Sequence, residues 1–204
     1  MTIRNELRRE MRARRRLVTR AERLAAARRF AVAADRLHLL RPGRRIAIYL
    51  PYGSEADVIP IARRAWLRGC KVYAPVVTHR RRFHMRFAPY TPGPALTFNA
   101  YGIAEPDHAS HERIDARALD VIFMPLVAFD ARGWRLGSGA GFYDRSLRHL
   151  RPSRLWRRPQ LIGVAYELQL TDTLVPNAWD VPMDAVLTES RTYLFTTRPE
   201  WSAR

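Results

Sequence analysis

Residues 121–147, VIFMPLVAFDARGWRLGSGAGFYDRSL, decide how this chain is expected to fold. They begin with an almost continuous apolar run, which is typical of a strand buried on both faces. A glycine-rich segment follows, and then a sequence that predicts a helix from about Gly141 to Leu150. A buried strand, a glycine-rich turn and a helix in this order indicate a parallel sheet. In such sheets ligands bind beyond the carboxyl ends of the strands, so the glycine segment is a candidate site.

The rest of the chain continues this alternation of strands and helices. Helices are predicted over 3–16, from Thr19 to about Leu40 and over 57–69, and Thr19 and Glu22 form a capping box. Strands are predicted over 45–50, 71–77, 120–127, 161–166 and 185–190, with 83–90 as an edge strand or hairpin arm and 91–118 as turns and loops. The sequence therefore predicts one α/β domain over residues 1–204. We expect a three-layer, open, mostly parallel sheet with helices on both faces.

Three polar or glycine-rich segments follow the predicted strands and should converge at one edge of the sheet. They are 51–57, 128–144 and 167–180. Because the carboxyl ends of parallel strands meet at the same edge, this convergence is the main structural expectation for the site.

The composition limits the class of protein. The single cysteine, Cys70, excludes an internal disulfide framework, and no apolar run approaches the roughly 18–20 residues of a membrane span. The first residues lack the apolar core of a secretory signal, so we expect a cytoplasmic protein, and we expect a monomer. The net charge of +17 comes almost wholly from arginines spread along the chain. That charge suits small anionic ligands, and we favour these over nucleic acid.

The glycine-rich segment resembles two nucleotide-binding motifs and matches neither. A Walker A loop needs a lysine after its last glycine, and the dinucleotide fingerprint needs a third glycine where Phe142 stands. A tight strand-to-helix turn would also use such glycines. With Arg135 and Arg145 flanking the segment and Asp144 beside it, we favour a site for phosphate and a divalent cation. Guanidinium groups pair with phosphates, and Mg²⁺ is held by carboxylates together with substrate phosphates.

The same segment carries a family resemblance. RLGSGAGFYDRSL resembles the R-L-G-x-G-x-G-Y-Y-D-R signature of 5-formyltetrahydrofolate cyclo-ligases, also called methenyltetrahydrofolate synthetases. Further segments fit this family in order: IRNELR, YLPYGSEAD, MRFAPY, NAYGIAEP, MPLVAFDARGWRLG and WDVPMDAVLTE. The resemblance covers about residues 3–190 and implies a sheet of the NagB/RpiA/CoA-transferase type.

The resemblance implies a reaction, its substrates and a metal. ATP would phosphorylate the formyl oxygen of 5-formyltetrahydrofolate, including its polyglutamylated forms, and a second folate nitrogen would close the ring as phosphate leaves. The products would be 5,10-methenyltetrahydrofolate, ADP and phosphate, and Mg²⁺ would be required. The residues are compatible with this chemistry, because phosphoryl transfer depends chiefly on positioning and charge neutralisation.

The resemblance also assigns residues to ATP. They are Arg4 and Arg8 near the start of the chain, and Arg135, Leu136, Gly137, Ser138, Gly139, Ala140, Gly141, Phe142 and Tyr143 in the glycine segment. Arg4 stands where the family usually has lysine, which keeps the charge and changes the geometry. Ala140 stands where glycine is common, and alanine resists a positive φ. Without the resemblance, Arg4 and Arg8 would be interpreted as a solvated helix face.

Folate and metal contacts follow from the same resemblance. The implied folate-binding residues are Leu50, Glu55, Met85, Phe87, Tyr101 and Tyr143, and the implied Mg²⁺ carboxylates are Asp144 and Asp180. A carboxylate at position 55 can accept the N–H donors of an amino-pyrimidine edge, although alone it would be interpreted as an acid near a helix N-terminus. Met85, Phe87 and Tyr101 suit a core or hairpin face equally well. Asp180 alone would be interpreted as a turn residue.

Two other functions stay open at this point. A basic RNA-binding module would use the net charge and the arginine-dense first 45 residues, although no aromatic and basic RNA-binding strand motif is present. An ATP-dependent enzyme with a different substrate would use the same glycine loop. The regions 50–57 and 83–101 would then distinguish it from a folate enzyme.

Overall fold

A computed structural model describes residues 2–79, 84–93, 95–99, 102–107, 109, 112–148 and 158–195. Within them a seven-stranded sheet has the order β11-β10-β9-β6-β1-β2-β3. Its strands are β1 (Arg45–Ala47), β2 (Lys71–His79), β3 (His84–Pro89), β6 (Val121–Pro125), β9 (Gln160–Val164), β10 (Ala185–Leu187) and β11 (Thr192–Leu194). The five central strands are parallel, and β3 and β11 are antiparallel edges. The predicted mostly parallel α/β sheet is confirmed.

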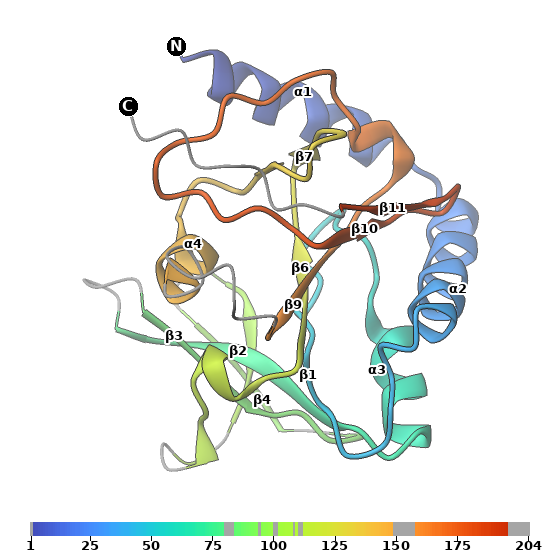
Figure 1. Ribbon diagram of the computed structural model, residues 1–204, viewed down its shortest axis with the longest axis vertical. Coiled ribbons are helices and arrows are strands. Elements are labelled where there is room, and N and C mark those ends of the chain that lie inside the picture. Colours follow the sequence, from blue (N-terminus) through green and yellow to red (C-terminus); the bar gives the residue numbers. More distant parts are fainter. Residues whose placement is uncertain are drawn as a thin grey trace.

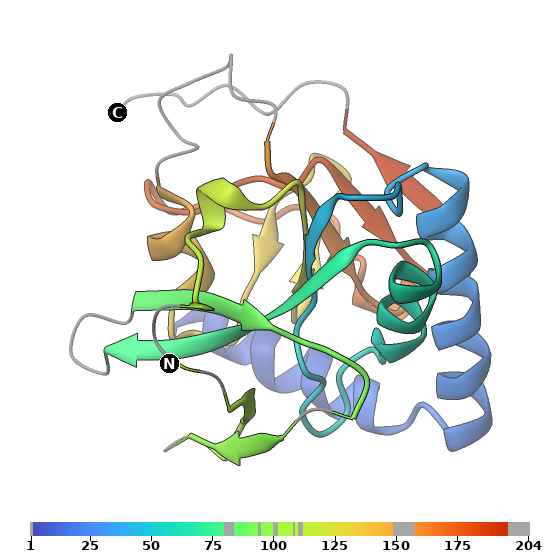
Figure 2. The same cartoon turned by 90° about the horizontal axis from the view of Figure 1, so that it is seen from below.

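One face of the sheet is covered by two helices, α2 (Arg20–Arg36) and α3 (Ile59–Leu67), as Figures 1 and 2 show. Phe30 of α2 and Ile61 of α3 pack with sheet residues such as Ile46 and Phe123 in one buried cluster. The predicted capping box opens α2, because Thr19 accepts from the backbone N–H of Glu22 and the Glu22 carboxylate accepts from the backbone N–H of Thr19. Pro60 in the first turn of α3 is tolerated there, since that turn needs no N–H partner.

The opposite face of the sheet is covered by shorter elements. The helix α4 (Phe142–Ser146) and the 3₁₀ turn η2 (Ala116–Ala118) lie on this side, and the 3₁₀ turn η4 (Glu167–Gln169) follows β9. Ala47, Ile122 and Met124 point to this second cluster, whereas their neighbours Ile46 and Phe123 point to the first. This alternation follows from the two-residue period of a strand.

The helix α1 (Ile3–Arg16) lies across the carboxyl end of the sheet (Figure 1). Its Leu7 and Met11 pack on Trp134 and Leu136 of a small hairpin, β7 (Ala128–Phe129) and β8 (Arg135–Leu136). That hairpin leads directly into the glycine segment. The apolar stripe of α1 therefore fixes this helix beside the candidate site.

Several element boundaries differ from the sequence predictions. The helix α2 ends at Arg36 and not at about Leu40. Within the region predicted as turns and loops, β4 (Leu96–Phe98) and β5 (Ala104–Pro106) form a two-stranded sheet. The strand β11 was not predicted, because its short, partly exposed sequence carries no strong apolar signal. No helix among the described residues has the length and apolar character to cross a membrane.

Candidate active site

A cavity of about 540 Å³ opens at the carboxyl edge of the sheet. Its walls come from α1, the β1–α3 loop, β2, β3, β5, the end of β6 and the glycine segment. The predicted site residues on its walls are Leu50, Glu55, Met85, Arg135, Gly137, Ser138, Gly141, Phe142, Tyr143 and Asp144. The expected convergence of the 51–57 and 128–144 segments is therefore observed, whereas no residue of the third predicted segment, 167–180, lines the cavity. The volume is ordinary for a small-molecule site.

The other predicted residues lie elsewhere. The cavity is not lined by Arg4, Arg8, Leu136, Gly139, Ala140 or Asp180, and Tyr101 lies outside the described residues. Phe87 is fully buried in the second core cluster and pairs with the backbone of Ile114. Of the two roles that the sequence left open for Phe87, the structure favours the core.

The glycine loop, defined here as residues 137–141, is held by its carbonyl groups. Three arginines donate to three of these carbonyls: Arg8 Nε to Gly137 O at 2.9 Å, Arg12 Nη2 to Ser138 O at 3.0 Å and Arg145 Nη1 to Ala140 O at 2.8 Å. The backbone N–H groups from Ser138 to Gly141 find no acceptor within the described part of the chain. The loop thus offers a run of unpaired amide donors, which is the arrangement that binds anions in backbone nests.

Two glycines of this loop adopt backbone angles that favour glycine. Gly139 has φ +115° and Gly141 has φ +69°. Ala140 between them does not have a positive φ, and the only non-glycine residue that does, among those described, is His38. Alanine therefore fits position 140 without strain, which answers the concern raised by its departure from the family pattern.

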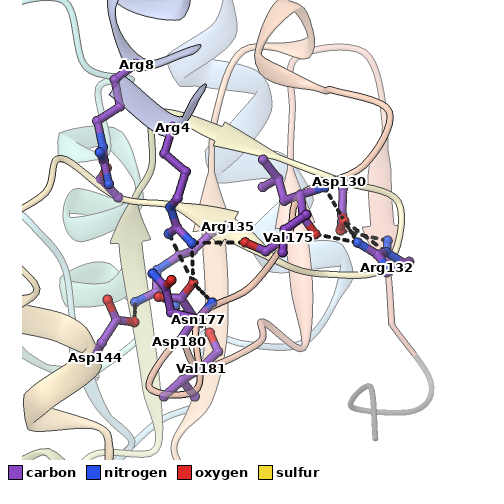
Figure 3. A network of polar contacts seen from close by, with 12 residues as sticks. Arg4, Arg8, Asp130, Arg132, Arg135, Asp144, Val175, Asn177, Asp180 and Val181 are labelled. Carbon is purple, nitrogen blue, oxygen red and sulfur yellow. Dashed lines mark hydrogen bonds and ion pairs between the residues drawn. The ribbon is translucent and has the colours of Figure 1, made fainter. Parts of the chain in front are cut away.

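The two candidate metal carboxylates are each bound to an arginine (Figure 3). Asp144 Oδ1 accepts from Arg135 Nη2 at 2.5 Å, and Arg135 Nη1 donates to Val181 O at 2.5 Å. Asp180 Oδ2 accepts from both terminal nitrogens of Arg4 at 3.0 Å and from the backbone N–H of Asn177 at 2.9 Å. Arg135 therefore links Asp144 to the segment that carries Asp180.

This pair of carboxylates can still take part in binding a cation. Asp144 Oδ2 and Asp180 Oδ1 have no partner within the described ranges, so each carboxylate keeps one oxygen for a ligand. No group of three or more acidic, histidine or cysteine side chains gathers among the described residues. A Mg²⁺ ion held here would take its remaining ligands from phosphate and water, which is usual for nucleotide-bound Mg²⁺.

Asp130 fixes the relative position of these two segments. It is fully buried, accepts from the backbone N–H groups of Arg132, Trp134 and Leu174, and forms an ion pair with the Arg132 guanidinium at 2.8 Å. Arg132 in turn donates to Leu174 O at 2.5 Å (Figure 3). Asp130 thus joins the β7–β8 hairpin to the chain that leads to Asp180. Sequence reasoning missed it, although a single acid between two apolar segments was the available signal.

Glu55 and Tyr143 also line the cavity. Glu55 Oε2 accepts from the backbone N–H of Tyr52 at 3.1 Å. Burial raises the pKa of the Glu55 carboxyl, and the hydrogen bond from Tyr52 and the charges of Arg15 and Arg12 oppose that shift. The Tyr143 hydroxyl is buried without a partner in the described chain, and burial raises its pKa, with Glu55 adding to the effect. The Tyr143 hydroxyl is therefore a neutral hydrogen-bond donor held ready for a ligand.

Four further charged residues on the cavity wall were not predicted: Arg12, Arg15, Arg16 and Glu105. Arg15 and Glu105 are each only 8% exposed. Glu105 Oε1 accepts from Val77 N at 2.9 Å and Asn99 Nδ2 at 2.7 Å, so it joins β5 to β2. The spacing of Arg4, Arg8, Arg12 and Arg15 places them along one face of a helix, and that was the signal available for Arg12 and Arg15. Glu105 left none, because its burial depends on the β4–β5 sheet.

Comparisons with known proteins agree with this geometry. The model of the 5-formyltetrahydrofolate cyclo-ligase family matches residues 1–189. The 5-formyltetrahydrofolate cyclo-ligase of Escherichia coli (strain K12) is 35% identical over 150 residues, which cover 72% of this chain and 79% of that protein. The Haemophilus influenzae protein of the same name is 34% identical over 149 residues, covering 72% and 76%.

A solved structure is similar over almost the whole chain. The NMR structure of Aquifex aeolicus 5,10-methenyltetrahydrofolate synthetase has a TM-score of 0.79 at 27% sequence identity, covering 99% of this chain and 97% of that one. The fold, the ordered sequence segments and the family match lead to the same assignment. This chain belongs to the 5-formyltetrahydrofolate cyclo-ligase family.

Proposed function

We propose that this protein converts 5-formyltetrahydrofolate to 5,10-methenyltetrahydrofolate with ATP and Mg²⁺, releasing ADP and phosphate. The observation that carries the proposal is that one cavity brings together two sets of polar groups. One set is the unpaired amide N–H groups of the glycine loop, and the other is the Glu55 carboxylate and the Tyr143 hydroxyl. An anionic co-substrate and a heterocycle with N–H donors can therefore meet in one enclosed space.

The first step of the proposed reaction is phosphoryl transfer. The N–H groups of residues 138–141 would bind phosphate oxygens of ATP, and the positive charge of Arg8, Arg12 and Arg135 surrounds them. The formyl oxygen of the folate attacks the γ-phosphorus, the bond to ADP breaks, and the charge that develops falls on these donors. Such pre-positioned donors are the main protein contribution to phosphoryl transfer.

The second step is ring closure on the activated carbon. The second folate nitrogen attacks the formyl carbon, and phosphate leaves with the former formyl oxygen. Glu55 would hold the amino-pyrimidine edge through its N–H donors, and Leu50 and Met85 supply apolar contacts for the rings. Tyr143 lines the cavity, and its buried hydroxyl, which has no partner among the described residues, would donate to the reacting region. Holding both reacting atoms in one geometry lowers the entropic cost of this step.

The donor set near the phosphates fits a divalent cation. Asp144 and Asp180 each keep one carboxylate oxygen without a partner among the described residues, and oxygen ligands of this kind are those that Mg²⁺ prefers. Bound there with ATP, Mg²⁺ would neutralise charge on the transferred phosphoryl group. Arg135 and Arg4 would hold the two carboxylates in position.

A coupled assay tests the proposal. Purified protein receives 5-formyltetrahydrofolate, ATP and Mg²⁺, and the absorbance of the methenyl product is followed together with ADP release. We expect one ADP for each methenyl product, and no product when ATP is omitted. Folded protein, verified by circular dichroism, that forms no ATP-dependent methenyl product would overturn the proposal.

A further inference from the structure

Arg15 is a buried arginine without a carboxylate partner among the described residues. Only 8% of it is exposed, and it lies on the wall of the cavity. Its Nε donates to Ser54 Oγ at 3.0 Å, and its Nη1 donates to Leu126 O at 3.4 Å. A guanidinium carries five N–H donors, so these two contacts leave most of its donors unused. Burying a charge in this way is costly unless something else pairs with it.

Arg15 and Glu55 are held next to each other in the cavity. The hydroxyl that Arg15 binds belongs to Ser54, the residue directly before Glu55. Burial lowers the pKa of Arg15, and the negative charge of Glu55 opposes that shift. No ion pair joins the two side chains, although both are described. Each therefore keeps hydrogen-bonding capacity for a ligand that lies between them or beside them.

The two side chains together match one edge of a pterin ring. On that edge the 2-amino group and N3–H are donors, and the oxygen at C4 is an acceptor. A carboxylate beside a guanidinium presents the complementary pattern: the two carboxylate oxygens can accept from the 2-amino group and N3–H, and the guanidinium can donate to the C4 oxygen. We propose that Arg15 is a substrate-binding residue that donates to the C4 oxygen while Glu55 accepts from N3–H and the 2-amino group.

This inference rests on the proposed function, since it requires a pterin in the cavity. It gives the buried Arg15, which has no carboxylate partner in the described part of the chain, a polar partner in the substrate. It also assigns Arg15 a specificity role that differs from the phosphate-facing arginines of α1. Those arginines, Arg8 and Arg12, donate to carbonyls of the glycine loop, whereas Arg15 donates to the side chain that precedes Glu55.

A substrate analogue separates this role from a purely structural one. The 4-amino-4-deoxy analogue of 5-formyltetrahydrofolate replaces the C4 oxygen with an amino donor, which would face the Arg15 guanidinium, and it also lacks the N3–H that Glu55 would accept. Calorimetry without ATP measures the dissociation constants of both ligands for the wild type, Arg15→Gln and Arg15→Lys. Arg14→Gln is the matched control, because Arg14 does not line the cavity and contacts only its own helix, through an exposed ion pair with Glu10 and a hydrogen bond to Met11 Sδ. Turnover of 5-formyltetrahydrofolate is measured in parallel.

We expect the wild type to bind the amino analogue at least about tenfold more weakly than the substrate, since a site built to donate rejects a donor. Arg15→Gln should lower this ratio about threefold or more, because a glutamine amide can turn to offer either its oxygen or its nitrogen. The preference that remains in this variant comes from the missing N3–H at Glu55. Arg15→Lys should keep the preference and weaken substrate binding, and Arg14→Gln should behave as the wild type.

A wild-type ratio near one overturns the inference, and that measurement needs no variant to fold. An Arg15→Gln variant that keeps the wild-type ratio overturns it as well. If the wild type turns over 5-formyltetrahydrofolate and either of these results is found, the inference about Arg15 fails while the proposed function stands. A wild type that binds neither ligand and shows no turnover overturns both.

Discussion

The two sides of the cavity satisfy their polar groups in opposite ways. On the side of the glycine loop, arginines occupy the backbone carbonyls and leave the amide N–H groups unpaired. On the other side, Glu55 accepts from the backbone N–H of Tyr52, and Arg15 donates to the Ser54 hydroxyl. Both of these charged side chains line the cavity and keep further hydrogen-bonding capacity. The first side can bind any phosphate, because its donors are backbone N–H groups, which every residue except proline has. The second depends on particular side chains and therefore determines the substrate.

This difference predicts which substrate each mutation should affect. Changes in the glycine loop, or at Asp144 and Asp180, should change the apparent affinity for ATP or the rate of phosphoryl transfer. Changes at Glu55 or Met85 should raise the KM for folate and leave the apparent affinity for ATP unchanged. A variant that changes the KM for ATP and the KM for folate equally would show that the two sides do not bind the two substrates separately.

The largest effect is expected for Asp144→Asn. The amide keeps an oxygen for Arg135 and loses the charge that would hold the cation, so kcat should fall about 100-fold or more. The KM for folate should change little. Steady-state kinetics over a range of Mg²⁺ concentrations measures the effect, with exposed Asp172→Asn as the control. An Asp144→Asn variant that keeps the wild-type kcat would show that Asp144 does not bind the metal ion.

Glu55 should make folate binding sensitive to pH. Because burial raises its pKa, Glu55 takes up a proton at a higher pH than an ordinary glutamate does. As the pH falls through this raised pKa, the carboxylate is lost and the KM for folate should rise, while the KM for ATP stays level. Glu55→Gln should raise the KM for folate about tenfold or more at neutral pH and remove this pH dependence. A pH profile of the variant that still follows the wild type would contradict the assignment.

Gly139→Val should weaken ATP binding through backbone strain. Gly139 has φ +115°, which a β-branched residue rarely adopts, although a Cβ there would meet nothing closer than the Arg8 guanidinium at 3.9 Å. We expect the KM for ATP to rise about tenfold because the amide run is displaced. Ala140→Gly is the matched control, and its KM for ATP should stay within about twofold of the wild type, since Ala140 needs no positive φ. A Gly139→Val variant with unchanged ATP kinetics would show that the loop does not bind the phosphates.

Met85 and Phe87 should differ although both are buried in the same cluster. Met85 lines the cavity and Phe87 does not. Met85→Ala should raise the KM for folate several-fold, whereas Phe87→Ala should lower the free energy of unfolding by about 3 kcal/mol and leave that KM unchanged. Urea unfolding and folate kinetics on both variants make the comparison. A larger change in the folate KM for Phe87→Ala than for Met85→Ala would place Phe87 in the site.

Local signals in the sequence predicted most of the fold. The apolar runs of the central strands, the capping box at Thr19 and the edge strand at 83–90 are all confirmed. The small hairpin β7–β8 and the strand β11 were missed, because elements of two or three residues leave too little periodicity. Loops of 51–57 and 128–144 converge as expected from the rule for parallel sheets.

The inward direction of individual side chains was harder to predict. Arg15 resembles its exposed neighbours Arg14 and Arg16 in sequence, and only the packing of α1 on the β7–β8 hairpin buries it. Glu105 is buried because a two-stranded sheet forms beside β2, which no local pattern predicted. The ion pairs of Asp144 with Arg135 and of Asp180 with Arg4 likewise join residues far apart in the sequence or in separate elements.

Isotope transfer tests the central claim most directly, because that claim concerns one oxygen atom. The substrate is 5-formyltetrahydrofolate with ¹⁸O in its formyl group, and mass spectrometry of the released phosphate follows the label. If ATP phosphorylates the formyl oxygen in this cavity, each phosphate that accompanies methenyl product should carry one ¹⁸O atom. Unlabelled phosphate released together with methenyl product would contradict the account.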